Sequence, residues 1–122
     1  MNDKSFLNQS SFLGYVHCKL ILDKDGKGVG MDVLEANDAF EIITGIKKSN
    51  FVGQTFNKSD SHTPFSVKEW VDIYGDTALS GSHWELEKFY ESSQKWGKVH
   101  VSSPEKMYFT VAVVDITDII AH

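Results

Sequence analysis

The residue types that most often perform chemistry are few in this chain, and their spacing does not assemble a catalytic set. The single cysteine, Cys18, alternates with apolar residues along an expected strand, where a free cysteine behaves as a small buried hydrophobe. Asp60, Ser61 and His62 have the side chains of a hydrolytic triad. They are consecutive, however, whereas a working triad converges from separate segments. We therefore interpret these three residues as a polar loop.

The other titratable residues also favour exposed positions. Glu85 and Glu87 share one face of an expected strand and are expected to face solvent. His17 and His100 lie on strand faces assigned away from the helices. No group of cysteine and histidine residues has the spacing of a zinc site. The residues predict no catalytic side chain, no metal site and no enzymatic activity for this chain.

Composition restricts the partners. The chain has 122 residues, a formal net charge of -5, and 12 basic residues that are all lysine. Arginine is the residue that grips phosphate and reads guanine, so its absence argues against nucleic-acid binding. No apolar run reaches the roughly 18 residues of a membrane helix, and the N-terminus lacks the apolar centre of a signal peptide. We expect a cytoplasmic domain that does not insert into membranes.

The elements that would position these residues follow from periodicity and turn chemistry. Apolar residues at a period of two predict five strands, at 15–22, 29–36, 84–90, 95–102 and 107–116. Asn37 is a good cap for a short helix that ends at Gly45, and a further helical turn is expected at 49–52. Thr63 and Pro64 are expected to open a long helix ending at Gly81, after a loop at 54–62. The fold class is α+β, a five-stranded antiparallel sheet with helices on one face.

The last predicted strand is apolar on both faces, which indicates cover on both sides of the sheet. The helices would cover one side. Residues 1–13 could form a short amphipathic cap helix for the other side, alone or together with a partner chain. We expect a single domain at 14–118, with 119–122 beginning a linker to an output domain.

Three segments in this order resemble a known family. Residues 34–45 read Leu-Glu-Ala-Asn-Asp-Ala-Phe-Glu-Ile-Ile-Thr-Gly, which is similar to the strand-to-helix signature of PAS domains. Leu-Ser-Gly at 79–81, running into Trp-Glu-Leu-Glu at 84–87, resembles the family's exit from the long helix. Val-Val-Asp-Ile-Thr-Asp at 113–118 matches the ending that joins the last PAS strand to an output linker. The resemblance covers about residues 10–118 and implies a PAS-like (profilin-like) fold.

The resemblance also implies a role. A PAS domain binds a small molecule between sheet and helices, or dimerises, and relays a conformational change to an output module. The residues that would line such a pocket are Phe40, Ile43, Phe56, Trp70, Tyr74 and Phe109. Asp115, Ile116 and Thr117 would carry the output signal, and Asn37 would be the helix cap.

The resemblance argues against two cofactors. The light-sensing flavin branch has an Asn-Cys-Arg segment on a helix, which this sequence lacks, so a flavin photoadduct is not expected. Haem-binding members use a histidine on or near the long helix, whereas the helix body at 64–79 has none, and His62 and His83 flank it. The ligand is therefore unknown, with a small apolar molecule as one candidate.

Two functions follow from these expectations. The first is a sensory and dimerisation domain, the input module of a larger signalling protein such as a sensor histidine kinase or cyclase. It would form a homodimer through the N-terminal segment and the outer sheet face. The second is a small α+β enzyme or carrier that binds an apolar ligand in its core cavity. The second would need titratable groups that converge in that cavity.

Overall fold

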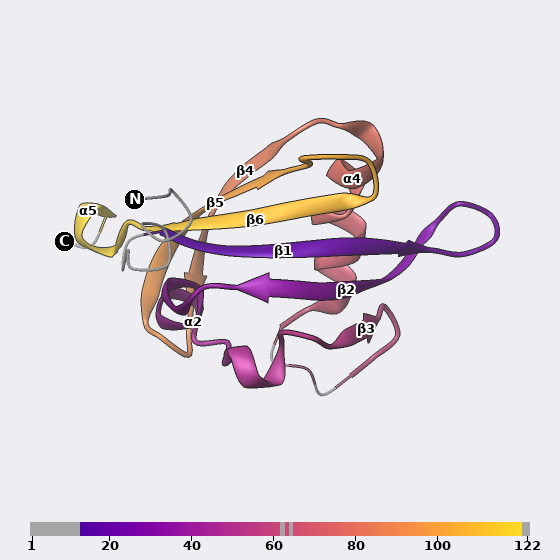
Figure 1. Cartoon of the computed structure of the whole chain (residues 1–122). Coiled ribbons are helices and arrows are strands. Elements are labelled where there is room, and N and C mark those ends of the chain that lie inside the picture. Colours follow the sequence, from indigo (N-terminus) through magenta and orange to yellow (C-terminus); the bar gives the residue numbers. More distant parts are fainter. Residues whose placement is uncertain (1–12, 62, 64, 121–122) are drawn as a thin grey trace, which may run out of the picture.

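The structure of the chain is a computed structural model that describes residues 13–61, 63 and 65–120 (Figure 1). The expected cap segment at 1–13 lies outside the described residues, apart from Leu13, and so do His62 and Pro64.

An antiparallel sheet of six strands forms one layer of the domain. Its strand order is β3-β2-β1-β6-β5-β4. The strands are β1 (Leu13–Leu22), β2 (Gly28–Ala36), β3 (Thr55–Asn57), β4 (Trp84–Tyr90), β5 (Lys95–Ser102) and β6 (Tyr108–Asp115). The α+β fold class is confirmed, with an antiparallel sheet, and all five expected strands are present. β6 is a central strand, between β1 and β5. Its residues that face the helices, Phe109, Val111 and Val113, are buried, whereas Ala112 and Val114 on the outer face are half-buried.

The sixth strand, β3, was not expected, because residues 54–62 were interpreted as a loop. β3 pairs with β2 at the sheet edge, with Phe56 opposite Met31. A Cβ on Gly30 would lie 2.5 Å from the Phe56 carbonyl oxygen, so the two strands approach closely where β2 has no side chain. A three-residue strand offers too few residues for a period, so only pairing with a neighbour reveals it.

Helices cover one face of the sheet, behind the strands in Figure 1. They are α2 (Asp38–Thr44), the 3-10 turn η1 (Lys48–Asn50), α3 (Val67–Glu69), the π-helical segment η2 (Trp70–Tyr74) and α4 (Asp76–Ser80). A last short helix, α5 (Thr117–Ile120), follows β6 at the end of the sheet. The core between helices and sheet takes alternate residues from the strands, such as Val16 and Cys18 of β1 and Val111 and Val113 of β6.

The first helix begins and ends as its sequence predicts. Asn37 Oδ1 accepts a hydrogen bond from the Phe40 amide at 3.1 Å, and also one from the Tyr15 amide at 2.9 Å. Asn37 Nδ2 donates to the Leu13 carbonyl oxygen at 2.9 Å. Gly45 ends the helix with a φ of 79°, in the left-handed region that glycine tolerates. The cap therefore ties α2 to the start of β1.

The long helix begins later than expected. Its N-cap is Ser66, whose Oγ accepts from the Glu69 amide at 3.2 Å. Thr63 was the expected cap, but its hydroxyl donates to the Phe65 carbonyl oxygen at 2.6 Å within the preceding loop. The predicted buried stripe is confirmed, because Val67, Trp70, Val71, Tyr74 and Ala78 are all buried. Gly81 ends the helix with a φ of 74°, as expected.

Candidate functional site

A crevice lies between the end of α2, the start of the long helix and strand β4. Its volume is about 210 Å³. α2 and its exit contribute Thr44 and Ile46, and the chain leading into and along the long helix contributes Phe65 and Trp70. β4 and its following turn contribute a continuous segment at 88–92. Three separate parts of the chain thus form the walls.

One wall of the crevice carries an ion pair. Lys88 Nζ lies 2.7 Å from Glu69 Oε1, and each of these side chains is 33% exposed. Lys88 Nζ also lies 5.8 Å from the centre of the Tyr90 ring. A pair with this much exposure contributes about 0–1 kcal/mol, because water screens it. The ion pair therefore adds little to stability, and Lys88 is one of the residues that line the crevice.

Sequence reasoning missed Lys88 and Phe65. The alternation of residues along β4 could have indicated that Lys88 points inward, since Lys88 lies between Leu86 and Tyr90 on the half-buried face of the strand. Its neighbours in the other register, Glu85 and Glu87, are exposed, as expected. Phe65 gave no periodic signal, because it lies in the loop before α3.

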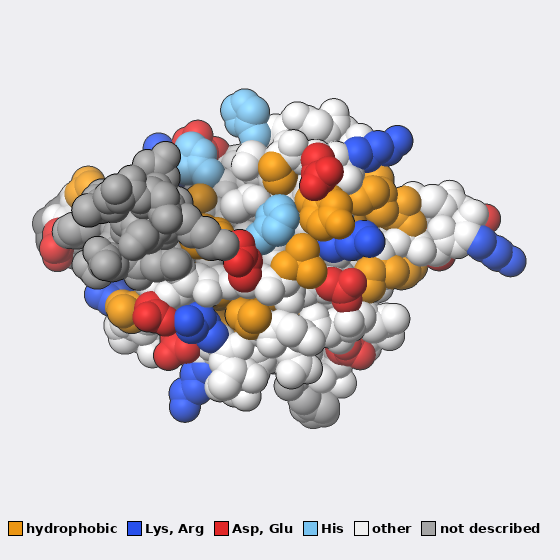
Figure 2. Space-filling view, viewed as in Figure 1, with side chains coloured by type: hydrophobic (Ala, Val, Ile, Leu, Met, Phe, Trp, Pro, Cys, Tyr) orange, Lys and Arg blue, Asp and Glu red, His pale blue; other side chains and the backbone are white. Residues whose placement is uncertain are grey.

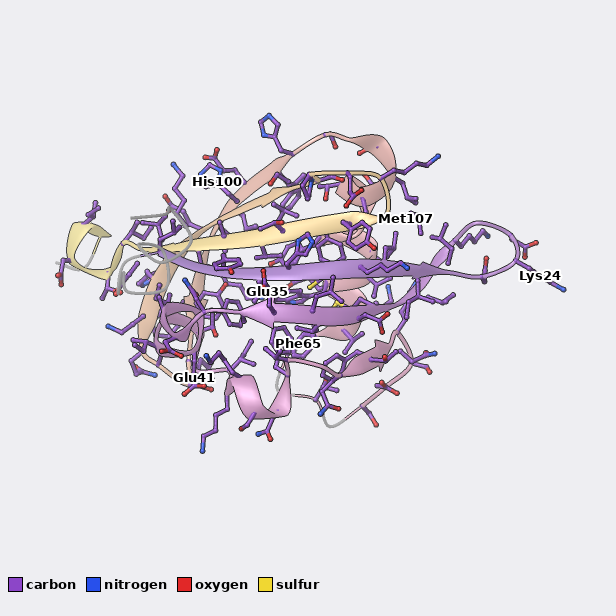
Figure 3. The ribbon with its side chains drawn as sticks, in the orientation of Figure 1. Lys24, Glu35, Glu41, Phe65, His100 and Met107 are labelled. Carbon is purple, nitrogen blue, oxygen red and sulfur yellow. The ribbon has the colours of Figure 1, made fainter. Side chains whose placement is uncertain are left out.

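The six residues proposed as pocket lining are all buried, at no more than 8% exposure. Trp70 is the one that also lines the crevice. Phe40 stacks on Phe51 with ring centres 5.5 Å apart, and Trp70 contacts Tyr74 edge-on at 5.1 Å. The structure therefore brings these side chains together as a packed aromatic core, and the crevice lies beside that core. Phe65, which Figure 3 labels, lies beside the η1 segment and contacts Phe51 at 5.0 Å.

The end of β6 forms a hydrogen-bonded junction. Asp115 Oδ1 accepts from the Thr117 amide at 2.9 Å and from the Thr117 hydroxyl at 2.6 Å. Thr117 Oγ1 in turn accepts from the Trp96 amide at 3.0 Å, and the Ile116 amide donates to the Trp96 carbonyl oxygen at 2.9 Å. Lys95 Nζ lies 3.4 Å from Asp115 Oδ2. The three predicted output residues therefore attach the start of α5 to the start of β5.

Burial and neighbouring groups shift the pKa of Asp115 at the end of β6 and the pKa of Tyr90 in the crevice wall. Burial by itself would raise the pKa of Asp115, but the hydrogen bonds from Thr117 and the charge of Lys95 outweigh it and lower that pKa. Burial raises the pKa of Tyr90, and the nearby Glu69 carboxylate raises it further. Asp115 is thus held as a carboxylate, and Tyr90 as a neutral phenol.

The surroundings of Cys18 do not fit a flavin photoadduct. Cys18 is fully buried on β1, opposite Val33 of β2 and Phe109 of β6. Burial raises the pKa of its thiol well above the usual range. A reactive cysteine needs access and a stabilised thiolate, and Cys18 has neither.

The outer face of the sheet, turned toward the viewer in Figure 2, mixes apolar, acidic, lysine and histidine side chains. His17 stacks on Tyr108 with ring centres 5.6 Å apart and contacts Thr110 Oγ1 at 3.1 Å. His100 Nδ1 lies 3.5 Å from Glu85 Oε2. Figure 3 shows Glu35 and His100 on this face. Both strand histidines lie away from the helices, as predicted.

Within the described part of the chain, no group of three or more histidine, cysteine or acidic residues could hold a metal ion. No helix among the described residues is long and apolar enough to cross a membrane.

Comparison with known proteins supports the fold. No family model and no curated protein matches the sequence. Among solved structures, the LOV protein of Rhodobacter sphaeroides is similar, with a TM-score of 0.50 over 94% of this chain and 69% of that chain. LOV proteins are domains of the PAS superfamily. The sequence identity is 15%, so the likeness defines the class of fold and leaves function to be argued from this chain's own residues.

Proposed function

We propose that this chain is a sensory domain that relays the occupancy of the crevice to the segment following β6. One observation carries the proposal: the turn between β4 and β5 lines the crevice and leads directly into the hydrogen-bonded junction at the end of β6. Ser92 of that turn lines the crevice. Three residues later, Lys95 contacts Asp115, and the adjacent Trp96 amide donates to Thr117. A ligand that moves this turn would change the hydrogen bonds that hold the start of α5.

The short path gives the relay a physical basis. β5 begins directly after the turn, and its pairing with β6 runs from Gly97–Asp115 to Ser102–Thr110. The turn also contacts α2, because a Cβ on Gly45 would lie 2.5 Å from Ser92 Cβ. Two-state rearrangement of such a packed contact is how small shifts at a ligand site are amplified. In the parent protein, we propose, the output is a kinase or cyclase module, as the PAS resemblance implies.

The function that we propose for this chain includes no enzymatic reaction. An enzyme would need titratable groups converging in a deep cavity. Lys88 instead lines an open crevice and is paired with Glu69. We also propose a cytoplasmic location, which the single cysteine favours because it cannot form an internal disulfide.

Hydrogen exchange of the whole chain tests the relay. Small metabolites that raise the melting temperature would be identified first, and exchange at 113–120 then compared with and without each. We expect bound ligand to change exchange there, and we expect Asp115→Ala to abolish that change. Asp118→Ala is the matched control, because Asp118 is an exposed acidic residue three positions further on, in α5. A ligand that binds in the crevice and leaves exchange at 113–120 unchanged would refute the relay.

We further propose that the domain forms a homodimer through residues 1–13 and the outer sheet face. Ala112 and Val114 of the central strand β6 are only partly buried on this face. Phe89 and Trp96 form a second apolar contact on it, with ring centres 5.4 Å apart. Sedimentation analysis tests the dimer. Ala112→Glu should give a monomer, whereas a wild-type chain that is monomeric at high concentration would overturn this proposal.

A further inference from the structure

The ammonium group of Lys88, in the crevice wall, has hydrogen-bond donors that its partner does not use. An ammonium group has three N–H donors. Among the described residues, the hydrogen-bond partner of Lys88 is Glu69. Glu69 is not part of the crevice wall, whereas Lys88 is. The carboxylate therefore holds the ammonium from behind, and the remaining N–H donors can face a molecule in the crevice.

The rest of the wall is aromatic and apolar. Phe65 and Trp70 contact each other with ring centres 5.3 Å apart, and Tyr90 and Ile46 complete this side. A cavity of about 150 Å³ accommodates a benzene ring. The volume of 210 Å³ thus suits one ring with a small polar substituent.

The backbone at Trp70 is unusual in the same place. Trp70 begins the π-helical segment, and the Gly75 amide donates to its carbonyl oxygen at 2.7 Å, five residues apart. Single π turns inside α-helices occur frequently at functional sites. This irregularity coincides with the residue that the packed core and the crevice share.

The charges favour an anion over a cation. A cationic ligand would have to displace Lys88 from beside Glu69 and Tyr90. Glu91 also lines the crevice, but it is exposed, so water screens its repulsion of an anion. An anion gains a charge-assisted hydrogen bond from an ammonium that is already held in place.

We propose that the crevice binds a single-ring aromatic carboxylate, with its carboxylate on Lys88 and its ring against Phe65 and Trp70. This inference rests on the proposed sensory function and names the chemical class of its signal.

Benzoate is the probe, followed by amide chemical shifts of the whole chain. We expect saturable shifts at Thr44, Lys88 and Ser92, with a Kd of about 1 mM or tighter. Acetate has the charge without the ring, and benzyl alcohol has the ring without the charge. Each should bind at least about tenfold more weakly, since one charge-assisted hydrogen bond or one buried ring is worth more than 1.4 kcal/mol.

Variants assign the binding to Lys88. Lys88→Met should weaken benzoate binding at least about tenfold. Lys98→Met is the matched control, because Lys98 lies on the neighbouring strand and pairs with Glu85 on the opposite face. It should leave binding unchanged. Glu69→Gln should retain or tighten binding, since the amide oxygen of Gln can still accept from the ammonium whereas the negative charge that repels an anion is gone. This variant shows that breaking the ion pair is not itself the cause of loss.

The outcomes separate this proposal from the sensory function. Benzoate binding that survives Lys88→Met, shifts confined to other amides, no saturable binding, or equal binding of benzyl alcohol would each overturn the ligand class. If another metabolite then altered exchange at 113–120, the relay would still stand. If benzoate bound at Lys88 without altering that exchange, the ligand class would stand and the relay would fall.

Discussion

The side chain of the cap residue Asn37 should stabilise the fold by as much as several ordinary hydrogen bonds. It is 2% exposed, and among the residues that the structure describes its amide group joins three backbone groups: the amides of Phe40 and Tyr15 and the carbonyl oxygen of Leu13. Asn37→Ala removes all three contacts while leaving the fold's apolar core unchanged. We expect this to be among the most destabilising single substitutions of a polar residue in the domain.

The magnitude follows from the contacts. Each hydrogen bond contributes about 1 kcal/mol net, and leaving a buried partner unsatisfied raises that cost. Three contacts predict a loss of about 3 kcal/mol in the free energy of unfolding. That is a large fraction of the roughly 5–15 kcal/mol that stabilises a typical domain. Asn37→Asp keeps the acceptor for Phe40 and Tyr15 and loses the donor to Leu13, so it should cost about 1–2 kcal/mol.

Urea denaturation followed by tryptophan fluorescence measures the difference. With a slope of about 1–3 kcal/mol per molar urea, a loss of 3 kcal/mol shifts the midpoint by about 1–3 M. The order of stability should be wild type, then Asn37→Asp, then Asn37→Ala. A loss below about 1 kcal/mol for Asn37→Ala, or equal midpoints for the two variants, would refute the reasoning that one side chain serves both helix and strand.

Three further predictions concern packing, pH and thiol chemistry. Gly14→Ala should destabilise the domain by about 1–3 kcal/mol, because the new Cβ would lie 2.6 Å from Phe40 Cα; the melting temperature measures this. The pKa of Asp115 is lowered by Thr117, so its carboxylate stabilises the fold above the ordinary pKa of 3.8 and loses that effect as pH falls through the folded value. The advantage of wild type over Asp115→Asn in urea titrations should therefore be constant near neutrality and shrink in acid. Cys18 should not react with Ellman's reagent at about pH 8 until the chain unfolds, because burial raises the pKa of its thiol.

Each of these has a control. Gly28→Ala should cost less than Gly14→Ala, because its Cβ would meet flexible side-chain ends at 3.1 and 3.2 Å. An advantage over Asp115→Asn that grows as pH falls would contradict the sign of the pKa shift. Cys18 reacting in native buffer at the rate seen in urea would contradict its burial.

The sequence by itself determined the class of fold, because the signals for it are local. Alternation along 15–22 and 107–116 needs no knowledge of neighbours, and neither does the cap at Asn37 or the left-handed glycine at Gly45. The late start of the long helix was missed although its signal was also local. Ser66 and Thr63 are both residue types that cap helices well. Ser66 is the cap, because its hydroxyl accepts from the Glu69 amide, whereas the Thr63 hydroxyl donates to the Phe65 carbonyl oxygen within the loop.

Tertiary structure alone decided the candidate site. β3 exists because its three residues meet an edge of β2, and a period cannot appear in three residues. The six aromatic and apolar residues predicted to line a pocket are buried in the core, where Trp70 packs against Tyr74. The open space is the crevice beside Trp70. Lys88 matters there because Glu69, 19 residues earlier, holds it from the helix. Pairing across that distance depends on the register of β4 and on the rotation of the helix, and both are set by global packing rather than by any local pattern of residues.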